Sequence, residues 1–223
     1  FTNKFSDKIE IHSFSNQDVA MSVLIKDRID ILVASDFFEI NVLEIPKRCG
    51  FAYLVDSNSI ESYKGQKTVA RYQKAEVIYK ELLSIYSENV PDVKFEASAD
   101  SYICTFLPVS GGSGSSSVAA AFAKKLALSG KKVLFLSLEK FSNSDIFFCG
   151  EGQSNFSDVI FTLKSKKNNL ALKLESYVKE DPSGVNFFSG VRTALDMLEI
   201  SEEDIERLFT GLKLVGSYDY IVV

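Results

Sequence analysis

Short apolar runs alternate with helical patterns over residues 1–88. The runs with the alternation or the continuous apolar character of strands are 8–14, 30–35, 50–57 and 68–73. Ser15 is placed to cap a helix over 15–28, with Asp18 three residues later. A second helix, with apolar residues at helical spacing, is expected over 74–88. Strands and helices that alternate in units of this size predict a doubly wound parallel sheet.

The same alternation resumes after residues 89–100, which have no clear period, contain Pro91 and are expected to form a linker. Further strands are expected at 101–109, 131–139 and 218–223. Further helices are expected at 118–129, before the helix-ending Gly130, and at 201–215, capped by Ser201. The sequence therefore predicts an α/β protein of two doubly wound parallel-sheet domains, residues 1–88 and residues 101–223.

A glycine- and serine-rich run, GGSGSSS at 111–117, connects the expected strand at 101–109 to the helix that follows. Such runs are usually flexible connectors between domains. Here the run passes directly from a buried strand into a helix, which is the setting of a phosphate-binding loop. Glycines let the backbone approach phosphates, successive N–H groups form a nest, and the helix adds the positive end of its dipole. This context favours a phosphate loop over a linker.

The composition, 46% hydrophobic and 25% charged residues, is typical of a globular protein with a buried core. A formal net charge of −5 argues against a general nucleic-acid binder, because neutralising phosphates needs a basic surface. No apolar run is long enough to cross a bilayer. The chain starts without Met and stops inside an apparent strand, so we expect segments of the natural protein to be missing at both ends.

The cysteines and the histidine offer no catalytic or metal site. Cys49, Cys104 and Cys149 are far apart and form no CxxC pair, which fits a reducing cytoplasm. His12 lies in an alternating run, where a strand-surface side chain is the expected role. The basic cluster 164–167 is too short to indicate more than a solvated turn.

The glycine-rich run resembles the deviant Walker A loop of the MinD/ParA family, K-G-G-x-G-K-[ST]-[ST]. Gly111, Gly112 and Gly114 match the three glycines of that pattern, and Ser116 and Ser117 match its hydroxyl pair. Ser110 and Ser115 stand where the family has its signature lysine and its P-loop lysine. The resemblance implies a site for ATP, with Mg²⁺ on Ser116. The residues implied to bind ATP are Ser110, Gly111, Gly112, Ser113, Gly114, Ser115, Ser116 and Ser117.

The run at 131–139 is similar to the family's second strand, which ends in D-x-D. Ser137 and Glu139 occupy the two acidic positions, so only Glu139 keeps a carboxylate and is the candidate catalytic residue. A solvated residue at a strand end is the equal alternative for Glu139. The run at 218–223 resembles the strand that leads to the Walker B aspartate, before which the chain ends. Because hydrogen bonds to charged groups contribute about 1.5–3 kcal/mol each, losing both lysines predicts ATP binding with feeble hydrolysis, at most a weak Mg²⁺-dependent ATPase.

Residues 1–88 resemble a response-regulator receiver that lacks its first strand. Counting from Asp30, the phospho-acceptor position falls on Ser35, with Asp36 one residue late. Ser57 and Lys74 are candidates for the conserved hydroxyl and lysine of a receiver. Strand ends are polar in any case, so this partial pattern favours a binding module without phosphorylation chemistry.

A receiver followed by a MinD-like ATPase is the arrangement of the TadZ/CpaE family of tight-adherence pilus systems. Three stretches, 70–88, 137–145 and 156–178, look like its Gram-positive branch, and the resemblance covers essentially the whole chain. It implies a cytoplasmic, nucleotide-dependent homodimer that marks a cell pole and binds other pilus-assembly or polar proteins through its receiver-like domain. It implies no specific nucleic acid and is compatible with peripheral membrane association. Two alternatives stay open: a cycling ATPase that positions a division site or DNA cargo, and a scaffold that binds no nucleotide.

Overall fold

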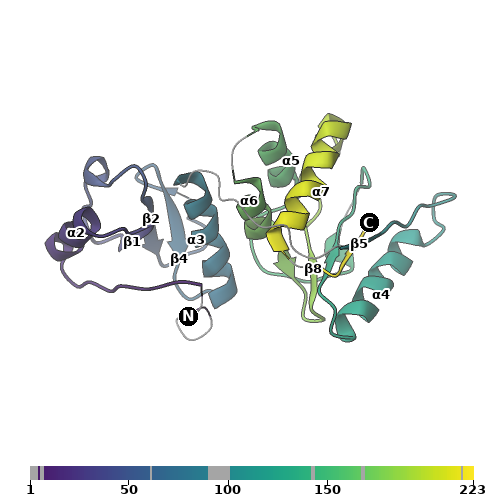
Figure 1. Cartoon of the computed structure of the whole chain (residues 1–223), viewed down its shortest axis with the longest axis horizontal. Helices are drawn as coiled ribbons and strands as arrows, with labels where there is room; N and C mark the ends of the chain where they lie inside the picture. Colours follow the sequence, from purple (N-terminus) through teal and green to yellow (C-terminus); the bar gives the residue numbers. More distant parts are fainter. Residues whose placement is uncertain are drawn as a thin grey trace. The chain divides into compact units, whose positions relative to one another are not determined.

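The computed structural model of the chain describes residues 5, 8–60, 62–89, 101–141, 144–166, 169–216 and 218–223. The chain divides into two compact units, Phe1–Pro91 and Asp92–Val223, and each is described by itself (Figure 1). Most of the expected linker, residues 90–100, lies outside the described residues, and its first residue, Asn89, ends a helix.

The first unit is built on a four-stranded sheet in the order β1-β2-β4-β3. The strands are β1 (Ile31–Ser35), β2 (Gly50–Val55), β3 (Ser62–Tyr63) and β4 (Gln66–Ala70), of which only β3 is antiparallel. The helical segments are α2 (Gln17–Lys26), the 3-10 turn η1 (Val42–Glu44) and α3 (Ala75–Asn89). Helix α3 covers one face of the sheet, where Ile85 packs with Ala52 and Val69. On the other face of the sheet, Ile40 and Ile45 pack against the buried residues.

Two details of the first unit differ from the sequence predictions. The expected strand at 8–14 is wrong, because its described residues pair with no strand and the side chains of Ile11 and Phe14 are exposed. An alternating pattern forms a strand only where a neighbour completes its hydrogen bonds. The predicted N-cap of α2, Ser15, is also wrong by one residue. The N-cap is Asn16, whose Oδ1 accepts hydrogen bonds from the backbone N–H groups of Asp18 and Val19.

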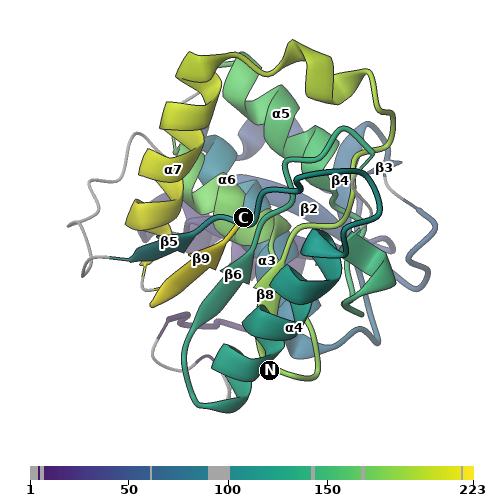
Figure 2. The same ribbon diagram turned by 90° about the vertical axis from the view of Figure 1, so that its right-hand side faces the viewer.

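The second unit contains a five-stranded sheet in the order β5-β9-β6-β8-β7, and Figure 2 shows β5, β9, β6 and β8 side by side. The strands are β5 (Tyr102–Cys104), β6 (Val133–Phe135), β7 (Lys179–Glu180), β8 (Val185–Phe187) and β9 (Tyr220–Val222), of which only β7 is antiparallel. The helices are α4 (Ser115–Leu128), α5 (Phe156–Lys164), α6 (Leu170–Tyr177) and α7 (Glu202–Gly216), with 3-10 turns η2 (Ser144–Ile146) and η3 (Asp196–Glu199).

Helices cover both faces of this second sheet. On one face, the small residues Ala119 and Ala123 of α4 pack against Phe135. On the other face, α5, α6 and α7 pack against Leu134 and Ile221. Alternating residues of β6 therefore face opposite layers, which confirms the expectation that this strand is buried on both faces. The mixed, mainly parallel α/β sheets agree with the predicted fold class.

The helix starts in the second unit follow local signals. The predicted cap of α7 is confirmed, since the Ser201 N–H and Oγ both donate to the Asp204 carboxylate and the Asp204 N–H donates back to Ser201 Oγ. Helix α4 begins at Ser115, three residues earlier than predicted. No helix in the described part of the chain is long and apolar enough to span a membrane.

Candidate functional site

The glycine-rich loop leaves β5 and enters α4 through two residues with left-handed backbone. Gly112 has φ 76° and Gly114, the residue that caps α4, has φ 80°. Residues other than glycine adopt this region at a cost of roughly 1–2 kcal/mol. The Ser113 N–H donates to the Ser110 carbonyl over 3.2 Å, which closes a turn before the helix. The glycines are therefore required by the path of the chain.

The loop presents backbone N–H groups at an open surface. Residues 110–114 are all exposed. Gly114 is the N-cap of α4, and no side chain makes a capping hydrogen bond there. The first intrahelical hydrogen bond runs from the Val118 N–H to the Gly114 carbonyl over 2.9 Å. The N–H groups of the preceding turn have no partner within the helix. A Cβ added at Gly111, Gly112 or Gly114 would meet no other atom within 4 Å, so a ligand has space to approach.

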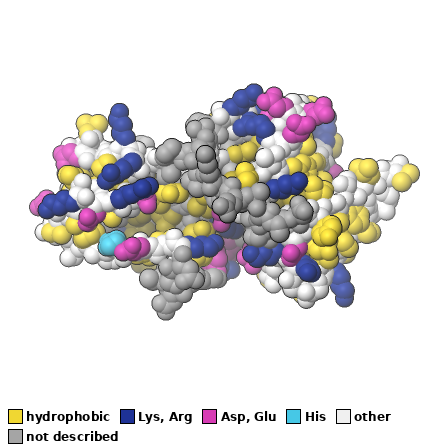
Figure 3. Space-filling view, in the orientation of Figure 1, with side chains coloured by type: hydrophobic (Ala, Val, Ile, Leu, Met, Phe, Trp, Pro, Cys, Tyr) yellow, Lys and Arg dark blue, Asp and Glu magenta, His cyan; other side chains and the backbone are white. Residues whose placement is uncertain are grey.

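No cation belongs to the loop itself. The loop projects at the right of the second unit in Figure 1, and Figure 3 shows the same projection in white and yellow without the colour of lysine or arginine. Ser110 is exposed and Ser115 is half-buried at the first position of α4. The loop's own contribution to anion binding would thus come from N–H groups, hydroxyls and the helix dipole.

The structure brings together two of the site residues expected from the sequence, Ser116 and Glu139. The Ser116 Oγ donates a hydrogen bond to Glu139 Oε1 over 2.6 Å. Glu139 follows the carboxyl end of β6, while Ser116 lies in the first turn of α4. Glu139 is exposed, yet its carboxylate is held beside the loop. Glu139 is therefore hydrogen-bonded and is not a freely solvated strand end, while its catalytic role stays a prediction.

The pair also fits the chemistry of Mg²⁺. A hydroxyl and a carboxylate are hard oxygen ligands, and Mg²⁺ is usually held by one or two protein ligands together with water and substrate phosphates. No group of three or more His, Cys, Asp or Glu side chains able to hold a metal occurs among the described residues. A cation bound at Ser116 and Glu139 would therefore need phosphate oxygens to complete its ligands.

In the first unit, the carboxyl ends of three parallel strands meet around Arg71, which directly follows β4. Its guanidinium donates to Ser35 Oγ over 2.7 Å and lies 3.0 Å from Asp56 and 3.6 Å from Asp36. The sequence prediction assigned the basic position to Lys74 and overlooked Arg71. The available signal was a basic residue immediately after β4, since the other two parallel strands, β1 and β2, are each followed directly by an aspartate.

Arg71 changes what this edge can do chemically. Its charge is permanent, because a guanidinium is not deprotonated in proteins. The side chain is 24% exposed and sits among the groups that a receiver would use for a metal and a phosphoryl group. Its Nε is buried without a hydrogen-bond partner among the described residues. Ser57 is engaged locally, with its Oγ 2.8 Å from the Oγ of Ser59. A permanent positive charge thus occupies this edge of the sheet, beside Asp36 and Asp56.

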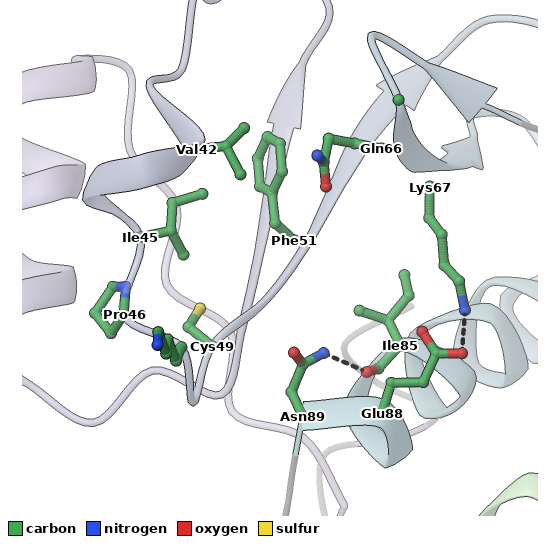
Figure 4. Close-up of a pocket in the computed structure, with 12 residues that line it drawn as sticks. Val42, Ile45, Pro46, Cys49, Phe51, Gln66, Lys67, Ile85, Glu88 and Asn89 are labelled. Atoms are coloured by element: carbon green, nitrogen blue, oxygen red, sulfur yellow. Dashed lines mark hydrogen bonds and ion pairs between the residues drawn. The ribbon is translucent and has the colours of Figure 1, made fainter.

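A cavity of about 370 Å³ lies at the opposite edge of the same sheet, near the starts of β2 and β4 (Figure 4). Three of its polar side chains are engaged: Lys67 pairs with Glu88 over 2.8 Å, and Asn89 donates to the Ile85 carbonyl over 2.9 Å. Burial raises the pKa of the Cys49 thiol to about 11, so the thiol is protonated and unreactive near neutral pH. These features assign no chemistry to the cavity.

Comparison with known families identifies the first unit. Residues 1–87 match the family model described as "TadZ-like, receiver domain". The first unit is similar to TadZ-like receiver domains. The match covers the Arg71 edge and α3 up to Ser87, so the sheet described above is that of a receiver-like fold. The comparison with curated proteins found no match for this chain.

Proposed function

We propose that this chain is an ATP-binding, dimerising hub of tight-adherence pilus assembly with weak ATP hydrolysis. The observation that carries the proposal is the Ser116–Glu139 contact behind a loop with two left-handed glycines. The family match of the first unit to TadZ-like receiver domains supports the pilus context. In this proposal the first unit binds other pilus-assembly or polar proteins, and the protein acts in the cytoplasm at a cell pole.

The residues around the loop have distinct roles toward ATP. The N–H groups of the loop and of the first turn of α4, apart from that of Ser113, hydrogen-bond the phosphates, and the N-terminus of α4 adds the favourable end of its dipole. Ser116 and Glu139 are the oxygen ligands through which Mg²⁺ would be held, and Mg²⁺ would neutralise phosphate charge. Glu139 orients an attacking water. With serine at positions 110 and 115, no loop lysine stabilises the charge of the transition state, so hydrolysis is slow.

A cycling ATPase that positions a division site or DNA cargo is the second candidate. The position of Glu139 beside Ser116 favours it, because hydrolysis needs a carboxylate there. The two serines in place of lysines favour the hub, in which ATP is a structural ligand. The net charge of −5 also argues against DNA as direct cargo.

Calorimetric titration of the whole chain with ATP, with and without Mg²⁺, tests the proposal. We expect binding that requires Mg²⁺. No binding at millimolar nucleotide would contradict the ATP site and favour a scaffold that binds no nucleotide.

A further inference from the structure

A triphosphate carries several negative charges, yet the loop at 110–117 contains no basic residue. We propose that Lys140 supplies the cation that this loop lacks. The inference rests on the proposed ATP site and identifies the side chain that neutralises its phosphates. The cation would come from the segment that follows β6 instead of from the loop itself.

The placement of Lys140 follows from that of its neighbour. Glu139 accepts from Ser116 over 2.6 Å, so the segment after β6 lies beside the first turn of α4. Consecutive Cα atoms are about 3.8 Å apart, and Lys140 begins the turn that follows Glu139. A lysine has a flexible four-carbon stem with three donors at its end. A lysine side chain at this position is therefore long enough to turn its ammonium toward a ligand on the loop.

Lys140 is also available to bind an anion. It is exposed, and its ammonium lies 5.8 Å from the centre of the exposed Phe141 ring. Cation–π contacts at exposed sites are weak. No carboxylate lies within ion-pair distance of Lys140 in the part of the chain that the structure describes. Its charge is therefore not already neutralised.

Most other cations that the structure describes in the second unit are paired, buried or far from the loop. Those already engaged include Lys124 with the Phe147 carbonyl, Lys164 with Asp204, Lys166 with Glu203 and Arg192 with Asp158. Lys131 and Lys132 precede β6 and so lie at the opposite edge of the sheet. Lys179 is buried on β7, two strands from β6, where desolvation lowers the pKa of its amine.

Calorimetry on the whole chain with Lys140→Ala tests the inference, with Mg·ATP, inorganic tripolyphosphate and adenosine as probes. We expect about tenfold weaker binding of ATP and tripolyphosphate, as for the loss of one charged hydrogen bond. Adenosine binding should not change. Lys140→Arg should retain most of the affinity. Lys131→Ala is the matched control, since it removes the same charge from the opposite edge of the sheet and should leave all affinities unchanged.

A double-mutant cycle sharpens the test. Ser115→Lys returns a cation to the first turn of α4, so Lys140→Ala should cost clearly less affinity in that background. Unchanged affinity in Lys140→Ala, or an equal loss in Lys131→Ala, would overturn the inference and leave the ATP site standing. Wild-type protein that binds neither ATP nor tripolyphosphate would overturn both the inference and the proposed function.

Discussion

Ser116 donates a hydrogen bond to Glu139 with 2.6 Å between Oγ and Oε1, although the two residues are 23 positions apart. The contact ties the first turn of α4 to the segment after β6, which is a central strand of the second sheet. Parallel strands place their carboxyl ends at one edge, where open α/β sheets bind ligands. The proposed chemistry of the second unit therefore depends on this one edge.

Glu139→Gln should lower ATP hydrolysis by more than tenfold and should also weaken Mg²⁺-dependent ATP binding. The amide keeps the size of the side chain but is a poorer ligand for Mg²⁺ and a poorer partner for water. Phosphate-release kinetics with saturating Mg·ATP measure the effect, and Glu206→Gln, on exposed surface of α7, is the control. Wild-type turnover near the enzyme median of roughly 10 s⁻¹ would contradict the account of a loop without lysines.

Gly114→Val should abolish detectable ATP binding. Valine resists the φ of 80° that Gly114 adopts, so the turn into α4 must distort. Gly130→Val is a matched control, because Gly130 has φ 84° and equally open surroundings but follows the other end of α4. Both variants should lose similar stability, and only Gly114→Val should lose affinity in calorimetry. Equal ATP affinity in the two variants would place the nucleotide elsewhere.

Arg71→Ala should destabilise the first unit by about 1–3 kcal/mol, because hydrogen bonds to charged groups contribute about 1.5–3 kcal/mol and this guanidinium is only 24% exposed. Arg71 contacts Ser35, at the end of β1, and Asp56, directly after β2, so its removal leaves both without this partner. Arg28→Ala is the control, since Arg28 is 77% exposed and its ion pair with Asp30, at 3.6 Å, lies at the surface. Exposed pairs of this kind contribute at most about 1 kcal/mol. Urea unfolding measures the stability of both variants. Equal unfolding midpoints for Arg71→Ala and Arg28→Ala would show that the cluster around Arg71 contributes no particular stability.

Asp36 should not be phosphorylated. The Arg71 guanidinium lies between Asp36 and Asp56, and a phosphoryl group with its metal would have to displace it. Intact-mass measurement after incubation with a small phosphodonor should show no added phosphoryl mass on residues 1–88. A stoichiometric gain that disappears in Asp36→Asn would refute this and restore the receiver chemistry.

Asp204→Ala should destabilise the second unit near neutral pH and have little effect in acid. Hydrogen bonds from Lys164 and Ser201 hold the pKa of Asp204 well below its usual range. A carboxylate with a lowered folded-state pKa contributes stability above its unfolded pKa of about 3.9, and that stability is lost as pH falls through the folded pKa. The gap in unfolding free energy between wild type and variant should therefore be constant above about pH 5 and should narrow progressively as pH falls below about 3.9. A gap that stays constant with pH would assign the effect to packing.

Several elements follow directly from sequence because their signals are local. The Ser201–Asp204 cap, the apolar run of β6 and the period of α3 each depend on neighbouring residues. Helix α5 was not predicted, although Asn155 and Asp158 form its capping box and give the expected spacing of polar residues. Residues 101–109 were predicted as one strand, yet β5 ends at Cys104, and Leu107 and Val109 are exposed beyond it.

The parts of the site that escaped prediction depend on tertiary placement. Arg71 belongs to no motif, and its role follows from three strand ends that meet only in the folded sheet. The basic cluster at 164–167 was interpreted as a solvated turn, but Lys164 and Lys166 pair with Asp204 and Glu203 of α7. For Glu139, the sequence left two roles equally open, and only the folded contact with Ser116 shows that it is not a freely solvated strand end.

Mg·ATP should promote a homodimer with the two loops at or near the interface. Two nucleotides brought close repel each other, and the MinD/ParA family offsets this with signature lysines that cross the interface. Ser110 stands at that position and is exposed, so the offset must come from Mg²⁺, loop N–H groups, hydroxyls or Lys140. The dimer should therefore need both nucleotide and Mg²⁺, and Ser110→Lys should tighten it. Sedimentation with and without Mg·ATP measures the association; a monomer under both conditions would contradict the hub, and a dimer indifferent to nucleotide would move the interface away from the loops.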